Sequence, residues 1–121
     1  MIELTAASRV YLAAGATDLR KSIDGLSLLV AEVLERDPLS SHLFCFCNRA
    51  RDKVKILHWA GNGFWLYYKR LEQGRFRWPA TAREAAAVEL SVRELRWLLD
   101  GLEIGRVAAQ AHRRLAYEAV S

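Results

Sequence analysis

Basic and aromatic side chains gather in one stretch of this chain, Leu43–Trp78. The stretch holds 9 of the 12 aromatic residues and 8 of the 18 basic ones, against only Asp52 and Glu72. Its net charge is +6 while that of the whole chain is +4, so the positive charge is local. Sheets that bind nucleic acid combine cations that neutralise phosphates with flat side chains that stack on bases. A solvated outer sheet face, on which Lys and Arg discourage edge-to-edge aggregation, explains the same pattern equally well.

The pI near 9.4 adds slight weight to the nucleic-acid interpretation. Under that interpretation the cations of the stretch contact phosphates, and two aromatic residues of one run offer stacking surfaces. The candidate binding residues are Arg49, Arg51, Lys53, Lys55, Lys69, Arg70, Arg75 and Arg77 for phosphates, with Trp65 and Tyr67 for bases.

Histidines and carboxylates do not form a pattern that indicates catalysis. His42, His58 and His112 are scattered, and none lies at metal-ligand spacing from another on one helix. Asp18 and Asp24 are nearly two helical turns apart, a spacing at which two carboxylates can hold a metal ion. A helix cap at Asp18 and a surface or ion-paired role for Asp24 explain these two residues better. We therefore expect no metal site.

The two cysteines, Cys45 and Cys47, share one face of a predicted strand and do not have the usual zinc-ligand spacing. Two small buried thiols are the expected outcome. The chain contains no G-x-x-x-x-G-K-[ST], G-x-G-x-x-G or G-x-S-x-G motif. We expect no enzymatic activity and no cofactor.

The basic stretch has the pattern of an antiparallel meander, in which short apolar or alternating runs are separated by turn residues such as Gly61 and Gly74. The predicted strands are Leu43–Cys47, Lys53–Trp59, Gly63–Arg70 and Arg75–Trp78. Because successive side chains of a strand point to opposite faces, Val54 and Ile56 face a core while Lys53 and Lys55 face away. The sequence thus predicts a sheet with one apolar face and one basic, aromatic face.

Helices are expected on both flanks of the meander. A stripe of apolar residues predicts one long helix over Asp18–Glu35, which ends before Pro38. Ser91 and Glu94 have capping-box spacing and begin a second helix that extends to Asp100. This helix covers an end of the sheet or the same face as the first. Short strands are expected over Arg9–Ala13 and Ala87–Leu90.

The length of 121 residues and the hydrophobic content of 52% favour one globular α+β domain. We place this domain at residues 1–105 and a tail, helical or frayed, at residues 106–121. No apolar run approaches the roughly 20 residues that span a bilayer, and the N-terminus lacks the features of a signal peptide. A cytoplasmic protein without membrane contact is expected.

Several ordered blocks of the chain resemble one family, the TnpB-type accessory protein encoded by the second open reading frame of the bacterial insertion-sequence group numbered sixty-six. The matching blocks are Thr17–Leu26, Asp37–Ser40, Leu43–Arg49, Asp52–Leu57, Trp59–Phe64, Tyr68–Pro79 and Leu95–Gly101. The resemblance covers residues 9 to 104 and leaves the tail uncovered. It implies a part in DNA transposition beside the transposase and another accessory protein of the same element, and it supplies no catalytic residues.

Two functions therefore follow from the sequence as alternatives. The first is a non-enzymatic accessory factor of transposition that contacts DNA through the basic, aromatic sheet face. The second is an adaptor that docks on the transposase or a sister accessory protein without touching DNA. The fold expected for either is an antiparallel meander packed against one long N-terminal helix, with a second helix near the C-terminus. The oligomeric state stays open.

Overall fold

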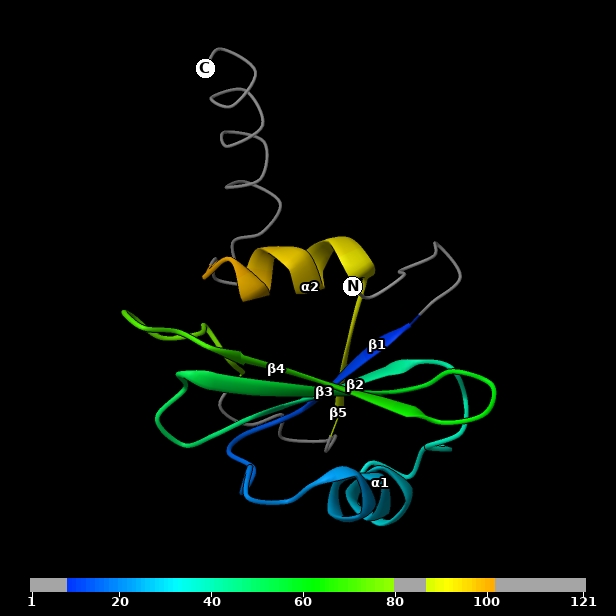
Figure 1. Ribbon diagram of the computed structural model, residues 1–121. Helices are drawn as coiled ribbons and strands as arrows, with labels where there is room; N and C mark the ends of the chain where they lie inside the picture. Colours follow the sequence, from blue (N-terminus) through cyan, green and yellow to red (C-terminus); the bar gives the residue numbers. More distant parts are fainter. Residues whose placement is uncertain (1–8, 80–86, 102–121) are drawn as a thin grey trace.

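The computed structural model describes residues 9–79 and 87–101. In chain order, these residues form β1 (Val10–Ala13), α1 (Ile23–Glu32), β2 (Leu43–Cys47), β3 (Lys53–Trp59), β4 (Phe64–Arg70), β5 (Ala87–Leu90) and α2 (Val92–Leu99). The five strands make one sheet in the order β4-β3-β2-β1-β5. The sheet lies between the two helices, with α1 on one side and α2 on the other (Figure 1). The fold therefore has three layers.

The sheet is mixed, so the prediction of an antiparallel sheet is wrong. β1 runs parallel to β2, with Val10 opposite Leu43 and Leu12 opposite Cys45, while the other neighbouring strands are antiparallel. The reason is the connection between β1 and β2, which passes through α1. A crossover through a helix returns the chain to the sheet in the same direction, whereas a tight hairpin would reverse it.

The first helix is also shorter than predicted. α1 begins after Ser22 and covers 10 residues, whereas the apolar stripe predicted a long helix over Asp18–Glu35. Asp18 does not cap it, because its carboxylate accepts a hydrogen bond from the backbone N–H of Arg20 at 3.0 Å. Such local side-chain bonds compete with helix formation. At the other end Glu35 has a left-handed backbone, with φ of 54°, which turns the chain away from the helix axis.

Three strands of the predicted meander are present as β2, β3 and β4, and Gly61 takes a φ of 77° in the turn between β3 and β4. The fourth predicted strand, Arg75–Trp78, is not one. Its residues have no partner in the sheet, although Phe76 and Trp78 are buried as their alternation predicted. The Phe76 amide donates to the Arg51 carbonyl at 2.6 Å, and these anchored rings close the α2 side of the sheet.

Two separate hydrophobic cores lie on the two faces of the sheet. On one side, Leu26 and Val30 of α1 pack on Phe44, Phe46 and Leu57. On the other side, α2 packs on a core cluster that consists of Val10, Leu12, Leu43, Cys45, Cys47, Val54, Ile56, Phe76, Trp78, Leu90, Leu95 and Leu98. The second helix therefore covers the opposite face from the first, not an end of the sheet or the same face.

α2 has the predicted capping box, in which the Ser91 hydroxyl accepts from the Glu94 amide at 3.1 Å and the Glu94 carboxylate accepts from the Ser91 amide at 3.0 Å. The predicted tail, residues 106–121, and the domain limit at residue 105 lie outside the described residues. Within the described residues, neither helix has the length and apolar character needed to cross a bilayer.

Candidate functional site

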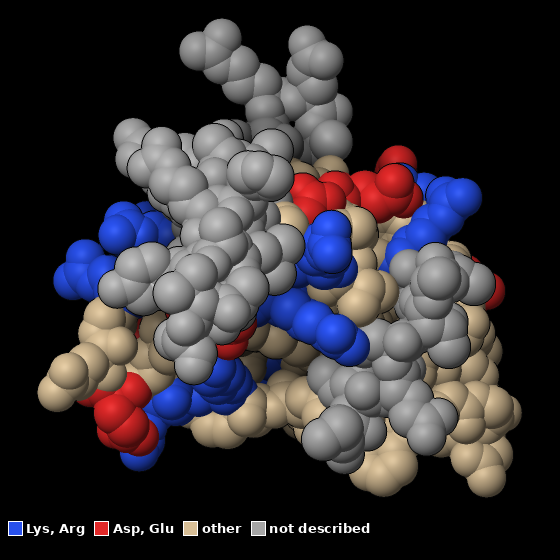
Figure 2. Space-filling model, turned by 90° about the horizontal axis from the view of Figure 1, so that it is seen from above, with Lys and Arg blue, Asp and Glu red and all other residues tan. Residues whose placement is uncertain are grey.

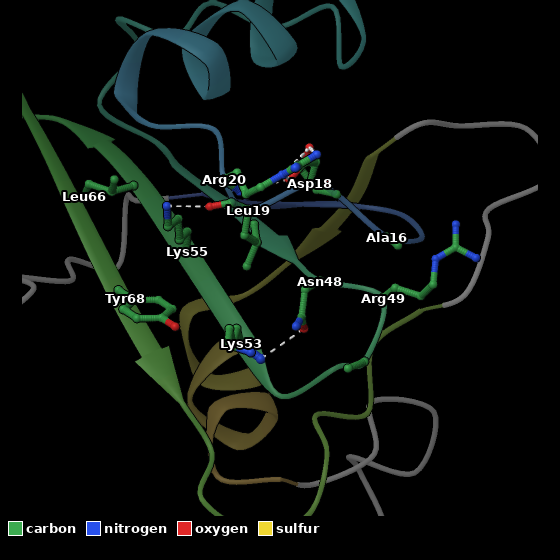
Figure 3. Close-up of a pocket in the computed structure, with 12 residues that line it drawn as sticks. Ala16, Asp18, Leu19, Arg20, Asn48, Arg49, Lys53, Lys55, Leu66 and Tyr68 are labelled. Atoms are coloured by element: carbon green, nitrogen blue, oxygen red, sulfur yellow. Dashed lines mark hydrogen bonds and ion pairs between the residues drawn. The ribbon is translucent and has the colours of Figure 1, made fainter.

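A basic pocket of about 800 Å³ opens on the α1 side of the sheet, beside β3 and β4. Its walls come from the loop that precedes α1, the turn between β2 and β3, and the outward-facing residues of β3 and β4 (Figure 3). The residues that line it are Ala16, Thr17, Asp18, Leu19, Arg20, Asn48, Arg49, Ala50, Lys53, Lys55, Leu66 and Tyr68. Four of these are cations and one is a carboxylate, so the lining is positively charged.

The single carboxylate is already bound by one of the cations. Arg20 holds Asp18 through two oxygens, with Nε 3.0 Å from Oδ1 and Nη2 2.8 Å from Oδ2. These hydrogen bonds, together with the one from the Arg20 amide, lower the pKa of Asp18 from its ordinary 3.8 to about 2. Asp18 is therefore ionised at neutral pH and offsets Arg20 alone, so it does not pair with the other three cations of the pocket, Arg49, Lys53 and Lys55.

Lys55 connects the sheet to the loop before α1. Its ammonium donates to the backbone carbonyls of Leu19 at 2.7 Å and Lys21 at 3.0 Å, and it lies 6.0 Å from the centre of the Tyr68 ring. Both hydrogen-bond acceptors are neutral, so the positive charge of Lys55 is retained. Lys55 thus supports the pocket wall and contributes charge to it.

The turn between β2 and β3 is organised by Asn48. Its Oδ1 accepts from the amides of Asp52 and Lys53, each at 3.1 Å, and its Nδ2 donates to Asp52 at 2.7 Å, which lowers the pKa of Asp52. The Lys53 ammonium lies 3.5 Å from Asp52, a loose ion pair. Arg49 extends outward at the rim (Figure 3), and it forms no ion pair with the residues that the structure describes.

The structure places six of the ten predicted binding residues in two groups, one on each face of the sheet. Lys53 and Lys55 line the pocket on the α1 side, together with Arg49 from the turn. Trp65, Tyr67 and Lys69 lie on the other face of β4. This division follows from the register, because Tyr67 pairs with Ile56 and Lys69 with Val54, both of which belong to the α2-side core.

On that second face Trp65 stacks on Tyr67, with ring centres 6.0 Å apart. Tyr67 packs on the α2-side core, and the Lys69 ammonium donates to the Leu99 carbonyl at the end of α2 at 2.9 Å. Trp65 remains 58% exposed. The predicted single basic, aromatic face is thus replaced by a basic pocket on one side and an aromatic pair on the other.

The remaining four predicted residues join neither group. Arg51 lines a smaller hollow of about 270 Å³ beside Trp78 and Pro79. Arg70 forms an ion pair with Glu72 at 2.8 Å. Arg75 and Arg77 are exposed and alternate with the buried rings of their segment.

Nine of the twelve residues that line the pocket were not among the predicted binding residues, and these nine include Arg20, Asn48 and Tyr68. Tyr68 could have been found from alternation combined with register, because it pairs directly with Lys55 and points to the same face. Its ring is 55% exposed. Asn48 and Arg20 carry no chemical signal in the sequence that separates them from ordinary turn and surface residues.

The pocket has the composition of an anion-binding site. Among the described residues, no cysteine or histidine lines the pocket and no three metal-binding side chains form a cluster. Cys45 and Cys47 are buried on the α2 side, where desolvation raises the pKa of Cys47 to about 12 and that of Cys45 further. Neither thiol is a nucleophile at neutral pH.

The α2 side of the molecule differs from the basic pocket in its charge pattern. Figure 2 shows this side, with Lys and Arg groups at several separate places and Asp and Glu groups between them. Among the described residues, the pocket beside β3 and β4 is therefore the better candidate for binding a polyanion.

The family described as "IS66 Orf2 like protein" matches residues 8–109 of the chain. One relative, "Uncharacterized protein y4hO" of Sinorhizobium fredii (strain NBRC 101917 / NGR234), is 40% identical over 95 residues, which cover 78% of this chain and 81% of the relative. A second, "Uncharacterized protein y4jC" of the same strain, is 31% identical over 106 residues, which cover 88% and 89%. No solved structure matches the chain significantly. This chain belongs to the IS66 Orf2-like family and is a transposition-associated accessory protein of an insertion sequence.

Proposed function

We propose that this accessory protein acts in transposition by contacting DNA, with the basic pocket as its phosphate-contacting surface. The observation that carries the proposal is the charge of the pocket: four cations line it, and its one carboxylate is bound by Arg20. Arg49 and Lys53 stand at its edge, and the ammonium of Lys55 has only carbonyl partners. Cations with exposed or neutral surroundings bind phosphates with release of counterions.

Tyr68 gives the pocket a stacking surface for a base. Its ring is 55% exposed and faces the same side as Lys53 and Lys55. The volume of about 800 Å³ falls within the range typical of small-molecule sites, so a nucleotide fits into it. An unpaired base can reach such a ring, whereas a base inside a duplex cannot. We infer that the preferred ligand is single-stranded DNA or an unpaired end.

The test is a fluorescence-anisotropy titration of labelled single- and double-stranded DNA over a series of salt concentrations. The informative variant is Arg49→Ala with Lys53→Ala, which removes two pocket cations and leaves Lys55 in place. We expect weaker binding and a salt dependence whose slope falls by about 1 for each phosphate that the variant no longer neutralises. Tyr68→Ala is expected to weaken binding to single strands more than to duplexes.

The matched control is Arg93→Ala with Arg96→Ala, which removes the same charge from exposed positions of α2, on the opposite side of the sheet. If binding depends only on net charge, the two double variants will weaken it equally, and the pocket is then not the site. Absence of binding to either DNA at low salt would refute the DNA proposal altogether.

A second candidate function is an adaptor that docks on the transposase. The observation that favours it is Trp65, which is 58% exposed and stacks on Tyr67 at 6.0 Å. Exposed Trp and Tyr residues are frequent anchors of protein interfaces. Trp65→Ala would then abolish capture of the transposase by the purified protein, while Arg49→Ala with Lys53→Ala would leave that capture intact.

A further inference from the structure

Among the residues that the structure describes, no strand pairs with the outer edge of β4. β4 lies at one end of the strand order and pairs with β3 alone among the described strands. Four of its seven residues are aromatic. Alternate residues of an edge strand direct their N–H and C=O groups away from the sheet. No described segment other than β3 forms a hydrogen bond to the backbone of β4. A further strand can therefore pair here.

The charges that usually protect such an edge are engaged elsewhere. The Lys69 ammonium donates to the Leu99 carbonyl at 2.9 Å, and Arg70 binds Glu72 at 2.8 Å. The other edge of the sheet, β5, has only four residues and carries Glu89 in an ion pair with Arg9 at 3.6 Å. Short, charged edges resist pairing and long aromatic edges invite it. Of the two edges, β4 is the one suited to association.

We propose that β4 pairs with β4 of a second copy of this chain, antiparallel and with Tyr67 on the two-fold axis. In this register all seven residues of the strand are paired. Trp65 then lies opposite Lys69 of the second copy, and Phe64 opposite Arg70 of the second copy. The aromatic residues occupy one end of β4 and the cations the other, so antiparallel pairing sets each cation beside an aromatic ring, a favourable arrangement.

The same charge distribution argues against parallel pairing in register. That arrangement would set Lys69 beside Lys69 and Arg70 beside Arg70, and like charges directly opposite each other are destabilising. A two-fold antiparallel contact is also closed, because each edge is used once and no free β4 edge remains. The product is a dimer with a continuous sheet.

The proposed dimer has a consequence for the basic pocket. A two-fold axis along the sheet normal keeps both α1 helices on one side, so both pockets open on the same side of the joined sheet. Leu66 and Tyr68 line the pocket and point to that side, and in this register Leu66 lies opposite Tyr68 of the second copy. The two pockets therefore meet at the interface. The dimer itself does not depend on DNA binding, and its test contains no DNA.

The first test is sedimentation or light-scattering measurement of the full chain over a dilution series. We expect wild type to be a dimer that dissociates on dilution. Trp65→Lys places a second lysine opposite Lys69 of the other copy, and this happens at two places in the dimer. The like charges repel, so the variant is expected to raise the dissociation constant roughly tenfold or more. Trp65→Glu sets a carboxylate opposite Lys69 and is expected to raise it less. The control is Leu28→Lys, at a 56% exposed position of α1 remote from the edge, which should leave the constant unchanged.

A second measurement covers the case in which a Trp65 variant folds poorly. Tyr67→Cys places two thiols opposite each other on the axis, where paired Cβ atoms are about 5 Å apart, and a short thiol-specific cross-linker should give a covalent dimer. Cys45 and Cys47 are buried and do not interfere, and Leu28→Cys is the control. A monomeric wild type, equal effects of Trp65→Lys and Leu28→Lys, or no cross-link through residue 67 would each overturn the proposal.

Discussion

The two faces of the sheet are built from the same strands but serve different purposes. The α2 side is closed: Val54 and Ile56 of β3 lie in its core, and Phe76 and Trp78 seal the space beside α2. Trp78 also donates from Nε1 to the Ala13 carbonyl at 2.9 Å, so its one polar group is satisfied in the interior. This side holds the sheet together.

The α1 side is closed only beneath the helix. α1 covers Phe44, Phe46 and Leu57, but the neighbouring part of β3 presents Lys53 and Lys55 in place of apolar residues. The pocket opens there. Because strand residues alternate in direction, a single strand supplies an apolar layer to one face and cations to the other. The closed face thus provides the rigid support on which a charged pocket can be held open.

The largest effect that tests this contrast between the two faces is expected when one aromatic residue of each face is replaced by alanine and the free energy of unfolding is measured. Phe76→Ala removes a fully buried ring from the α2-side core and is expected to lower the free energy of unfolding by about 3–5 kcal/mol. Tyr68→Ala removes a ring that is 55% exposed and is expected to cost about 0.5 kcal/mol. Urea denaturation measures both. Equal losses would show that the pocket wall belongs to the stabilising core.

A smaller effect separates the two lysines of β3. Lys55→Met leaves the carbonyls of Leu19 and Lys21 without their donor and is expected to lower the free energy of unfolding by about 1–2 kcal/mol. The matched variant Lys53→Met removes only a loose surface ion pair and is expected to cost less than about 1 kcal/mol. If thermal unfolding ranks the two variants in the opposite order, Lys55 does not fasten the loop to the sheet.

The sequence predicted the elements whose signals are local. Alternation and turn residues located β2, β3 and β4, and the spacing of Ser91 and Glu94 located the start of α2. The alternation of Arg75 and Arg77 with buried rings was also right. The same segment shows the limit of such signals, because an alternating pattern reports burial on one side and does not reveal whether the backbone has a partner strand.

The arrangement of the strands and helices could not be predicted from any short stretch of the sequence. Whether β1 runs parallel to β2 depends on where the chain returns after α1, and the sequence patterns leave that choice open. The helix start was misplaced because Asp18 is a good cap by type, yet its carboxylate bonds to Arg20 instead. The bond between Asp18 and Arg20 takes the place of a helix-capping bond from Asp18, and α1 begins later, after Ser22.

The candidate site was predicted in part for the same reason. Cations and aromatic residues were identified by type, but their assignment to one face required the register between β3 and β4. That register sets Lys55 opposite Tyr68 and Ile56 opposite Tyr67, so Tyr68 lies at the pocket and the Trp65–Tyr67 pair does not. Whether the ten predicted residues bind DNA stays a prediction, and the pocket variants address it for Arg49 and Lys53.

The smallest expected effect concerns the ion pair at the pocket edge. Hydrogen bonds from Arg20 lower the pKa of Asp18 from 3.8 to about 2, so its ionised form favours the folded loop above pH 3.8, and this contribution is lost as the pH falls through about 2. The pair is exposed, and salt weakens it, so the change in global stability is expected to be slight. An NMR titration of the Asp18 carboxyl measures it directly.

In that titration Arg20→Ala should move the midpoint up toward 3.8, while Arg93→Ala, on the other side of the sheet, should leave it near 2. The result bears on the pocket as well as on the loop. A wild-type midpoint near 3.8 would mean that Arg20 is not held by Asp18 in solution. Arg20 would then be free to contact phosphate, and the pocket would offer four cations to DNA rather than three.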